Sequence, residues 1–239
     1  MSVVPNFPPL MKGLAAGPAN PFAIACDQAR RGVDSGLVPW SIGEERLRAA
    51  LVLAPETPLE EAMAALPACA VGLQNAIGTL APAETAVHLE WQGGIRLNGG
   101  HVGALSVAAS TPDRKDTPDW LVVGLDLTLS LPADFEPGET PDWTALKEEG
   151  CGEIDPAMLL EAWARHSLFW LSGLEESGGR ARLHREFEGL SWRRGEAVSI
   201  VLSGSRHDGT FLGVDENFGM LLKSDTTRLL PMSQLLTED

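Results

Sequence analysis

Residues 88–107, HLEWQGGIRLNGGHVGALSV, decide the fold prediction. Apolar residues alternate with polar ones on both sides of residues 92–94, QGG, which is the pattern of a strand with one buried face. Residues 98–100, NGG, are typical of the tight turn of a β-hairpin. We predict two strands joined by a glycine-rich turn, with Trp91 on the inner face and His101 after the turn. The stretch is either a plain hairpin or an enzyme site that has lost several working residues.

The composition is that of a soluble globular protein and excludes two classes of partner. Of the 239 residues 44% are hydrophobic and 21% charged, and 33 acidic residues against 18 basic ones give a net charge of −15. Nucleic acid and anionic membrane surfaces attract clustered Lys and Arg, so we expect neither as a partner. No apolar run approaches the roughly 20 residues of a membrane span, and prolines interrupt the N-terminus, so we expect no signal peptide.

The cysteines indicate a reducing environment. Cys26, Cys69 and Cys151 are odd in number and far apart, and they match neither a CxxC motif nor a Cys/His metal site. Reduced structural thiols are typical of the cytoplasm, where we expect this protein. The sequence assigns no metal-ligating residue.

Helix and turn signals set the order of the other elements. Asn20 caps a helix that ends at Gly32. Two short strands follow, and then a capping box at residues 57–60 opens a second helix, which Pro67 kinks or splits. After the hairpin come a strand, an excursion on the surface and a long helix from Pro156.

The character of the sequence changes at Arg193. Short strands with tight, glycine-containing turns fill the rest of the chain, which is typical of a small SH3-like β-barrel. We predict an α+β domain at residues 1–190 and a small SH3-like barrel at residues 193–239.

This order of elements resembles that of the biotin/lipoate protein ligase family. Asn20 stands at the family's Ser-Thr-Asn helix opening. Residues 90–94, EWQGG, stand at its Lys-Trp-Pro-Asn-Asp turn, and His101 replaces the lysine of the Lys-Leu-Ala-Gly segment that follows. Residues 120–131 match the strand that carries the family's Gly-Ile-Asn, and the C-terminal strands resemble the barrel of bacterial biotin ligases. The resemblance covers most of the chain and implies the mixed sheet with helices of class II synthetase-like proteins.

The family's chemistry implies charges that this sequence lacks. Members join a carboxylate, biotin or lipoate, to the α-phosphate of ATP with Mg²⁺, and then pass the acyl group to a carrier-protein lysine. An Arg-rich loop and a lysine supply positive charge where negative charge grows. Here the loop is residues 41–47, SIGEERL, whose Glu44 and Glu45 repel phosphate. His101 is a weaker, pH-dependent cation.

The resemblance and the neighbouring charges define a candidate site. His101 is the catalytic candidate, in place of the family lysine. Arg46, Arg48 and Arg96 are either solvated surface charges or, if they converge, a bidentate site for a carboxylate. Asp126 is either a ligand-facing acid or a solvent-facing one. The substrate-binding candidates are Asn20, Trp40, Arg48, Trp91, Gly93, Gly94, Arg96, Gly103, Gly124 and Asp126.

Two functions stay open. The chain is either a divergent ligase or acyltransferase of altered or lost activity, or a non-catalytic protein that holds a small carboxylate or a carrier domain on a ligase scaffold. The resemblance implies ATP, Mg²⁺ and biotin or lipoate, an acyl-adenylate ligand, a biotinyl or lipoyl carrier domain as partner, and a homodimer as one assembly state. Each missing charge costs about 2–4 kcal/mol of transition-state stabilisation, which favours altered or lost adenylation.

Overall fold

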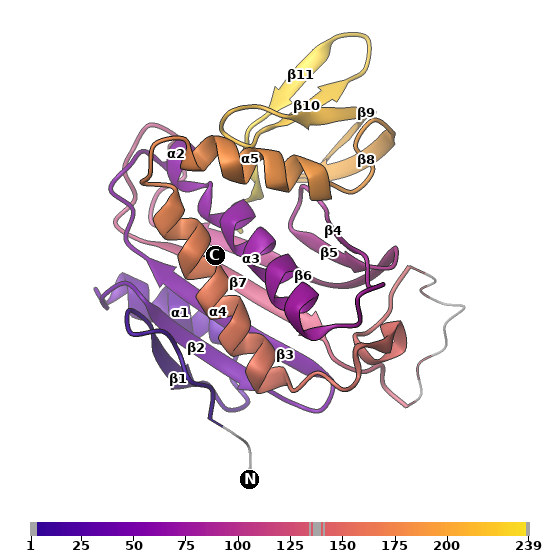
Figure 1. Ribbon diagram of the computed structural model, residues 1–239. Helices are drawn as coiled ribbons and strands as arrows, with labels where there is room; N and C mark the ends of the chain where they lie inside the picture. Colours follow the sequence, from indigo (N-terminus) through magenta and orange to yellow (C-terminus); the bar gives the residue numbers. More distant parts are fainter. Residues whose placement is uncertain (1–3, 134, 136–139, 141, 238–239) are drawn as a thin grey trace.

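A computed structural model describes residues 4–133, 135, 140 and 142–237, and two β-sheets organise it (Figure 1). The predicted surface excursion at residues 131–155 lies partly outside the described residues; its described part includes a π-helical turn, Lys147–Cys151. The helices are α1 (Pro21–Arg30), α2 (Leu59–Ala62), α3 (Ala65–Leu80), α4 (Pro156–Gly173) and α5 (Gly179–Leu190), with a 3₁₀ turn at Met232–Leu235. The strands are β1 (Lys12–Ala15), β2 (Leu37–Ile42), β3 (Arg46–Leu53), β4 (Val87–Leu89), β5 (Gly94–Leu97), β6 (Gly100–Ala109), β7 (Leu121–Thr128), β8 (Ala197–Leu202), β9 (Ser205–Val214), β10 (Met220–Lys223) and β11 (Thr227–Leu230).

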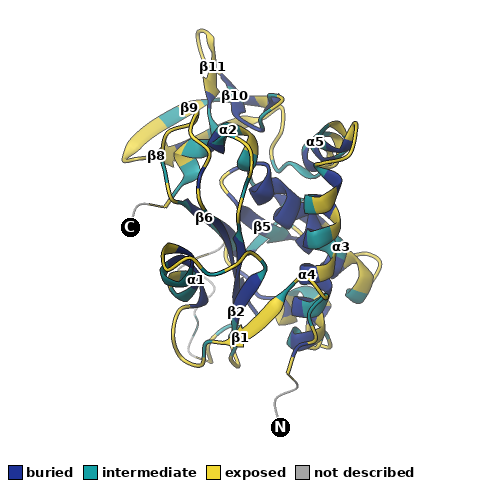
Figure 2. Ribbon diagram, turned by 90° about the vertical axis from the view of Figure 1, so that its left-hand side faces the viewer, coloured by how far each residue is buried: buried dark blue, intermediate teal, exposed yellow. Residues whose placement is uncertain are grey.

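The larger sheet has seven strands in the order β1-β2-β3-β7-β6-β5-β4. Strand β1 pairs with β2 in parallel, and the remaining pairs are antiparallel, so the sheet is mixed. Helices α3 and α4 cover one face and α1 covers part of the other, with the sheet between them (Figures 1 and 2). The main core lies under α3 and α4, and a smaller cluster lies under α1.

Local capping signals explain where α1 and α4 begin. The side chain of Asn20 accepts a hydrogen bond from the amide of Phe22 (2.9 Å), and proline follows Asn20 at the first helical position. Asp155 caps α4 in the same way through the amide of Ala157 (2.8 Å). These bonds satisfy amides that have no partner within the helix.

The predicted second helix is split in two, and the predicted capping box does not open it. No side chain caps α2; instead the amides of Leu59 and Glu60 donate to the carbonyls of Asp116 and Arg114 (2.8 and 3.0 Å). The break falls between α2 and α3, and Pro67 lies in the first turn of α3, where its missing N–H costs no hydrogen bond.

The predicted hairpin at residues 88–107 contains three strands, β4, β5 and β6, instead of two. A first turn at residues 90–93 separates β4 from β5, closed by a bond from the amide of Gly93 to the carbonyl of Glu90 (2.9 Å). Gly93 has a φ of 95°, and a Cβ there would lie 2.4 Å from the carbonyl oxygen of Leu105. Only glycine fits this turn without strain.

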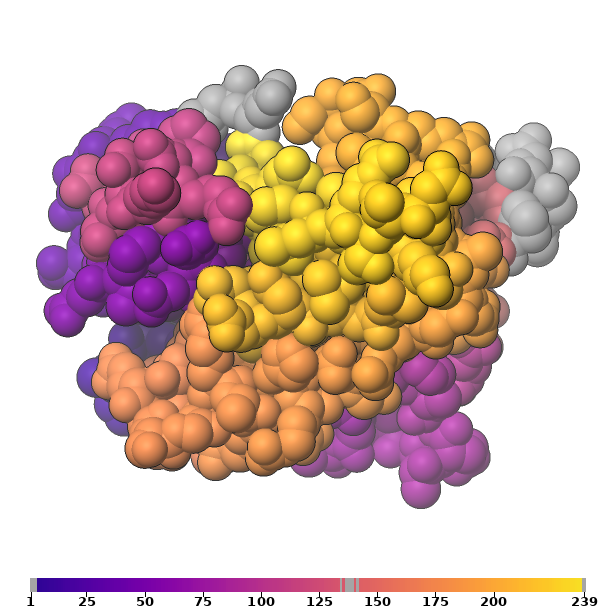
Figure 3. All heavy atoms as spheres, turned by 90° about the horizontal axis from the view of Figure 1, so that it is seen from above, coloured from indigo at the N-terminus to yellow at the C-terminus, as the bar shows by residue number. Residues whose placement is uncertain are grey.

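The C-terminal strands form a separate four-stranded antiparallel sheet in the order β11-β10-β9-β8, consistent with the predicted SH3-like barrel. This sheet covers one end of the molecule beside α5 (Figures 1 and 3). Its Phe211, Phe218 and Met220 belong to the same core cluster as the residues under α3 and α4. The domain limits 1–190 and 193–239 stay a prediction.

The interior contains a long apolar helical stretch and the cysteine thiols. The stretch Leu59–Leu80 has the length and mean hydropathy (1.3) of a membrane span. However, 72% of its most apolar 18-residue window is buried, as in the core helix of a globular protein, so it is weak evidence for a span. All three cysteines are buried. Burial raises the pKa of Cys69 to about 12, and nearby Ser167 offsets only part of this shift, so the thiol stays protonated at neutral pH.

Candidate functional site

Polar side chains gather on the sheet face opposite α3 and α4. On β3 and β7, Leu47 and Leu127 point into the main core, so their neighbours in sequence point to the other face. On β5, Ile95 does the same. We call this surface the polar face; its side chains are His88, Arg96 and His101, which are register partners across β4, β5 and β6, and Arg46, Arg48, Asp126 and Thr128 on β3 and β7.

Two arginines of the polar face converge on one carboxylate. Arg46 Nε donates to Asp126 Oδ1 over 2.8 Å, and Arg48 Nε lies 3.4 Å from Asp126 Oδ2. Arg48 and Asp126 are direct register partners. The three side chains are 35%, 41% and 43% exposed, so the cluster is within reach of solvent and carries one net positive charge.

Arg96 is held separately. Its Nε pairs with the carboxylate of Glu90, its Nη1 donates to the carbonyl of Gly99 (2.7 Å), and its guanidinium lies 5.2 Å from the ring centroid of Trp192. Arg96 therefore does not join Arg46 and Arg48. Trp192 escaped the sequence analysis, since it lies far along the chain in a segment without a motif.

The ring of His101 packs against the ring of Trp143. Its amide donates to the carbonyl of Asp142 (2.7 Å), and its ring lies 4.8 Å from that of Trp143, which is 46% exposed. Burial lowers the pKa of His101; nearby Glu90 opposes this shift and Arg96 adds to it. The imidazole is therefore neutral at pH 7 and does not replace a fixed cation. Trp143 is a site residue that sequence reasoning missed.

The structure places the two candidate tryptophans away from the polar face. Trp91 is 3% exposed and donates from Nε1 to the carbonyl of Phe218 (2.8 Å), so it links the two sheets. Trp40 packs against the main core, on the side of α3 and α4. Asn20 caps α1 beside the polar face.

The candidate glycines have packing reasons. Gly93 permits the turn described above, and a Cβ at Gly94 would collide with the Glu90 side chain (2.3 Å). At Gly103 a Cβ would lie 2.1 Å from the carbonyl oxygen of Asp126, and at Gly124 it would lie 2.5 Å from the Phe22 ring. These positions allow close approach of strands and of α1.

Several buried polar atoms on this face make no hydrogen bond. Among the described residues, Arg48 Nε, Thr128 Oγ1, His88 Nδ1 and His101 Nδ1 have no hydrogen bond. Buried polar atoms in folded proteins are nearly always hydrogen-bonded. A polar ligand on this face would satisfy such atoms.

The carboxylates of the polar face do not fit a Mg²⁺ site. Asp126 is engaged by two arginines and Glu90 by Arg96. Within the described part of the chain, no group of three or more His, Cys, Asp or Glu could hold a metal ion.

A mixed sheet with α1 at its open face and a small C-terminal sheet defines a protein of the biotin protein ligase fold. Residues 7–189 match the sequence model of the biotin/lipoate A/B protein ligase family, and residues 201–238 match a domain of unknown function. The chain therefore belongs to the biotin/lipoate A/B protein ligase family.

Solved structures agree with this assignment. The chain is 53% identical to a biotin protein ligase-like protein of unknown function from Silicibacter sp. TM1040, with a TM-score of 0.91 over 98% of this chain and 100% of that one. The biotin protein ligase of Aquifex aeolicus is 14% identical (TM-score 0.74, 94% and 97% covered). That of Leishmania major in complex with biotinyl-5-AMP is 16% identical (TM-score 0.57, 93% and 99% covered). These last two likenesses show the fold alone. No curated protein matches the sequence significantly.

Proposed function

We propose that this protein binds a small carboxylic acid of the biotin or lipoate type on its polar face, and that it has lost most or all ATP-dependent adenylation. One observation carries the proposal: Arg46, Arg48 and Arg96 are each paired with a carboxylate of the same chain. The arginine charges that could bind a triphosphate are therefore partly neutralised by these carboxylates.

The surroundings of the arginines also disfavour a nucleotide. The β2–β3 turn carries exposed Glu44 and Glu45, whose charges repel phosphate. His101 is neutral at pH 7 because burial lowers its pKa. Adenylation brings two anions together, and a site with little free positive charge stabilises that transition state poorly.

A single carboxylate suits this charge balance better. The Arg46–Asp126–Arg48 cluster keeps one net positive charge, and guanidinium N–H groups bind carboxylates bidentately. Arg48 Nε and Thr128 Oγ1, which make no hydrogen bond, are donors for such a ligand. The acid class follows from the family, since the Aquifex aeolicus relative was solved with biotin and ATP.

Calorimetry tests both halves of the proposal. Biotin, lipoate, ATP–Mg²⁺ and a non-hydrolysable biotinyl-AMP analogue are titrated into the protein, and ATP–pyrophosphate exchange is measured with each acid. We expect heat with biotin or lipoate, weak or no heat with ATP–Mg²⁺, and no exchange above background. Arg46→Gln/Arg48→Gln should abolish acid binding, whereas Arg206→Gln, an exposed arginine of β9, should leave it unchanged. Robust pyrophosphate exchange, or no heat with either acid, would overturn the proposal.

Partners and location remain part of the proposal. A carrier domain would be a binding partner whose lysine stays unmodified, which mass spectrometry after incubation with acid and ATP tests. Three buried cysteines, far apart in the sequence, fit the reducing cytoplasm. Sedimentation would show whether the chain forms the predicted homodimer.

A further inference from the structure

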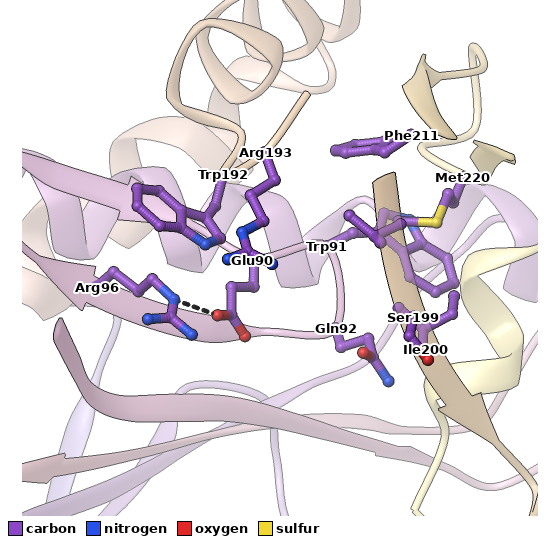
Figure 4. A pocket seen from close by; sticks show the side chains of 11 residues that line it. Glu90, Trp91, Gln92, Arg96, Trp192, Arg193, Ser199, Ile200, Phe211 and Met220 are labelled. Atoms are coloured by element: carbon purple, nitrogen blue, oxygen red, sulfur yellow. Dashed lines mark hydrogen bonds and ion pairs between the residues drawn. The ribbon is translucent and has the colours of Figure 1, made fainter. Parts of the chain in front are cut away.

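A pocket lies where the two sheets meet, away from the Arg46–Asp126–Arg48 cluster. The β4–β5 turn, the segment after α5, and strands β8, β9 and β10 line it (Figure 4). Its volume is about 250 Å³. A cavity of about 150 Å³ is enough to hold benzene in an engineered protein core, so this pocket has room for a substituted ring.

The walls of the pocket differ in character. Glu90, Arg96 and Arg193 lie on one side, while Phe211 and Met220 lie on the other (Figure 4). An apolar wall opposite charged groups is the arrangement of sites for small amphipathic ligands. The charged side carries one net positive charge, which favours an anion.

The segment after α5 is fixed beside this pocket by a hydrogen bond at each end. The amide of Trp192 donates to the carbonyl of Leu89 in β4 (2.8 Å), and the amide of Gly195 donates to the carbonyl of Phe211 in β9 (2.6 Å). Between these anchors Arg193 has a φ of 56°. A left-handed arginine costs about 1 kcal/mol or more, and such strain is typical of functional positions.

Of the two arginines that line the pocket, Arg193 is the one available to bind a ligand. Arg96 already donates hydrogen bonds to the carboxylate of Glu90 and to the carbonyl of Gly99. Arg193 has a loose contact with Glu196, 3.9 Å between Nε and Oε2, and both side chains are more than half exposed. A pair of this kind contributes little, so its guanidinium can bind another carboxylate.

We propose that this pocket is a second ligand site, separate from the Arg46–Asp126–Arg48 cluster, for a small carboxylic acid with an aromatic body. The carboxylate pairs with the guanidinium of Arg193. The ring lies against Trp192 and the apolar wall of Phe211 and Met220.

Phenylacetate and phenylacetamide form a matched pair of probes, because they differ in charge and hardly in shape. Binding is measured by calorimetry and by the shift of the Trp192 indole N–H resonance. We expect phenylacetate to bind more tightly than the amide. Arg193→Gln should weaken phenylacetate about tenfold, the value of one charge-assisted hydrogen bond, and leave the amide unchanged. Val198→Trp, which fills the half-buried rim, should abolish binding of both.

Two control variants make the result unambiguous. Arg206→Gln removes an exposed arginine of the same sheet outside the pocket and should change nothing. Arg46→Gln/Arg48→Gln should retain phenylacetate binding, even if biotin and lipoate fail to bind the wild-type protein. Equal affinity for the two probes, no binding of phenylacetate, or loss of it in the Arg46/Arg48 variant but not in Arg193→Gln would overturn the second site.

Discussion

Arg46 and Asp126 are joined by a hydrogen bond of 2.8 Å across adjacent strands, although 80 residues separate them in the sequence. Arg48 shares the same carboxylate from its register position. This acid between two arginines sets the charge of the polar face and so limits the anions it can hold.

Replacing the shared acid should strengthen anion binding. Asp126→Asn keeps the shape of the side chain and leaves both guanidinium groups without a carboxylate. We expect biotin or lipoate to bind several-fold more tightly in calorimetry. Stability should fall by at most about 1 kcal/mol, because the ion pairs are partly exposed. Asp208→Asn, which breaks the exposed pair with Arg206, is the control. Weaker acid binding in Asp126→Asn would show instead that the carboxylate orders the arginines.

The pH dependence of stability should contain a contribution from His101. Burial lowers its pKa in the folded protein below the ordinary histidine pKa of 6.5. As pH falls through 6.5, the unfolded chain takes up this proton while the folded protein does not, so stability decreases with falling pH until the folded pKa is reached. Urea unfolding at several pH values should show a shallower decrease in His101→Gln. His166, whose pKa burial also lowers, keeps its own contribution in that variant. An unchanged slope would contradict the assignment.

Acid binding should gain a pH-dependent component from the same histidine. Once protonated, His101 adds a positive charge to the polar face. We therefore expect lipoate to bind more tightly as pH falls through the lowered pKa of His101, and His101→Gln to lose that increase. His207→Gln on β9, outside the polar face, should behave like the wild type. Equal pH profiles for wild type and His101→Gln would refute this role.

Trp91 should matter for stability and not for ligand chemistry. Trp91→Phe keeps a buried ring but leaves the carbonyl of Phe218 without its donor. We expect a loss of about 1–3 kcal/mol in the free energy of unfolding, measured in denaturant. Trp143→Phe removes an indole that is 46% exposed and should cost much less. Similar losses in both variants would argue against a stabilising bond between Trp91 and Phe218.

Two glycine substitutions should have opposite signs. Gly93→Ala places a methyl group against the carbonyl of Leu105 at a positive φ and should destabilise the protein by several kcal/mol. Gly189→Ala near the end of α5 meets no atom within 4 Å and should stabilise it by about 0.5–1 kcal/mol. Thermal unfolding of both variants checks the pair; a tolerated Gly93→Ala would mean that the turn can move away from β6.

Much of the fold was predictable because its signals are local. Asn20 followed by proline starts α1 within three residues, a short apolar run indicates β3, and alternating apolar residues indicate the end of β7. The hairpin at residues 88–107 was predicted with one turn too few. Its first turn depends on a contact between Gly93 and the carbonyl of Leu105, which lies in another strand.

The sequence by itself determined the order of helices and strands, the family resemblance and the replacement of the Arg-rich loop by Glu44 and Glu45. The tertiary structure alone decided that Arg46 and Arg48 meet Asp126, that Arg96 turns to Glu90, and that a pocket opens between the sheets. The reason is physical: caps and alternation act over a few residues, whereas ion pairs and cavities depend on strand register and sheet packing, which bring distant residues together.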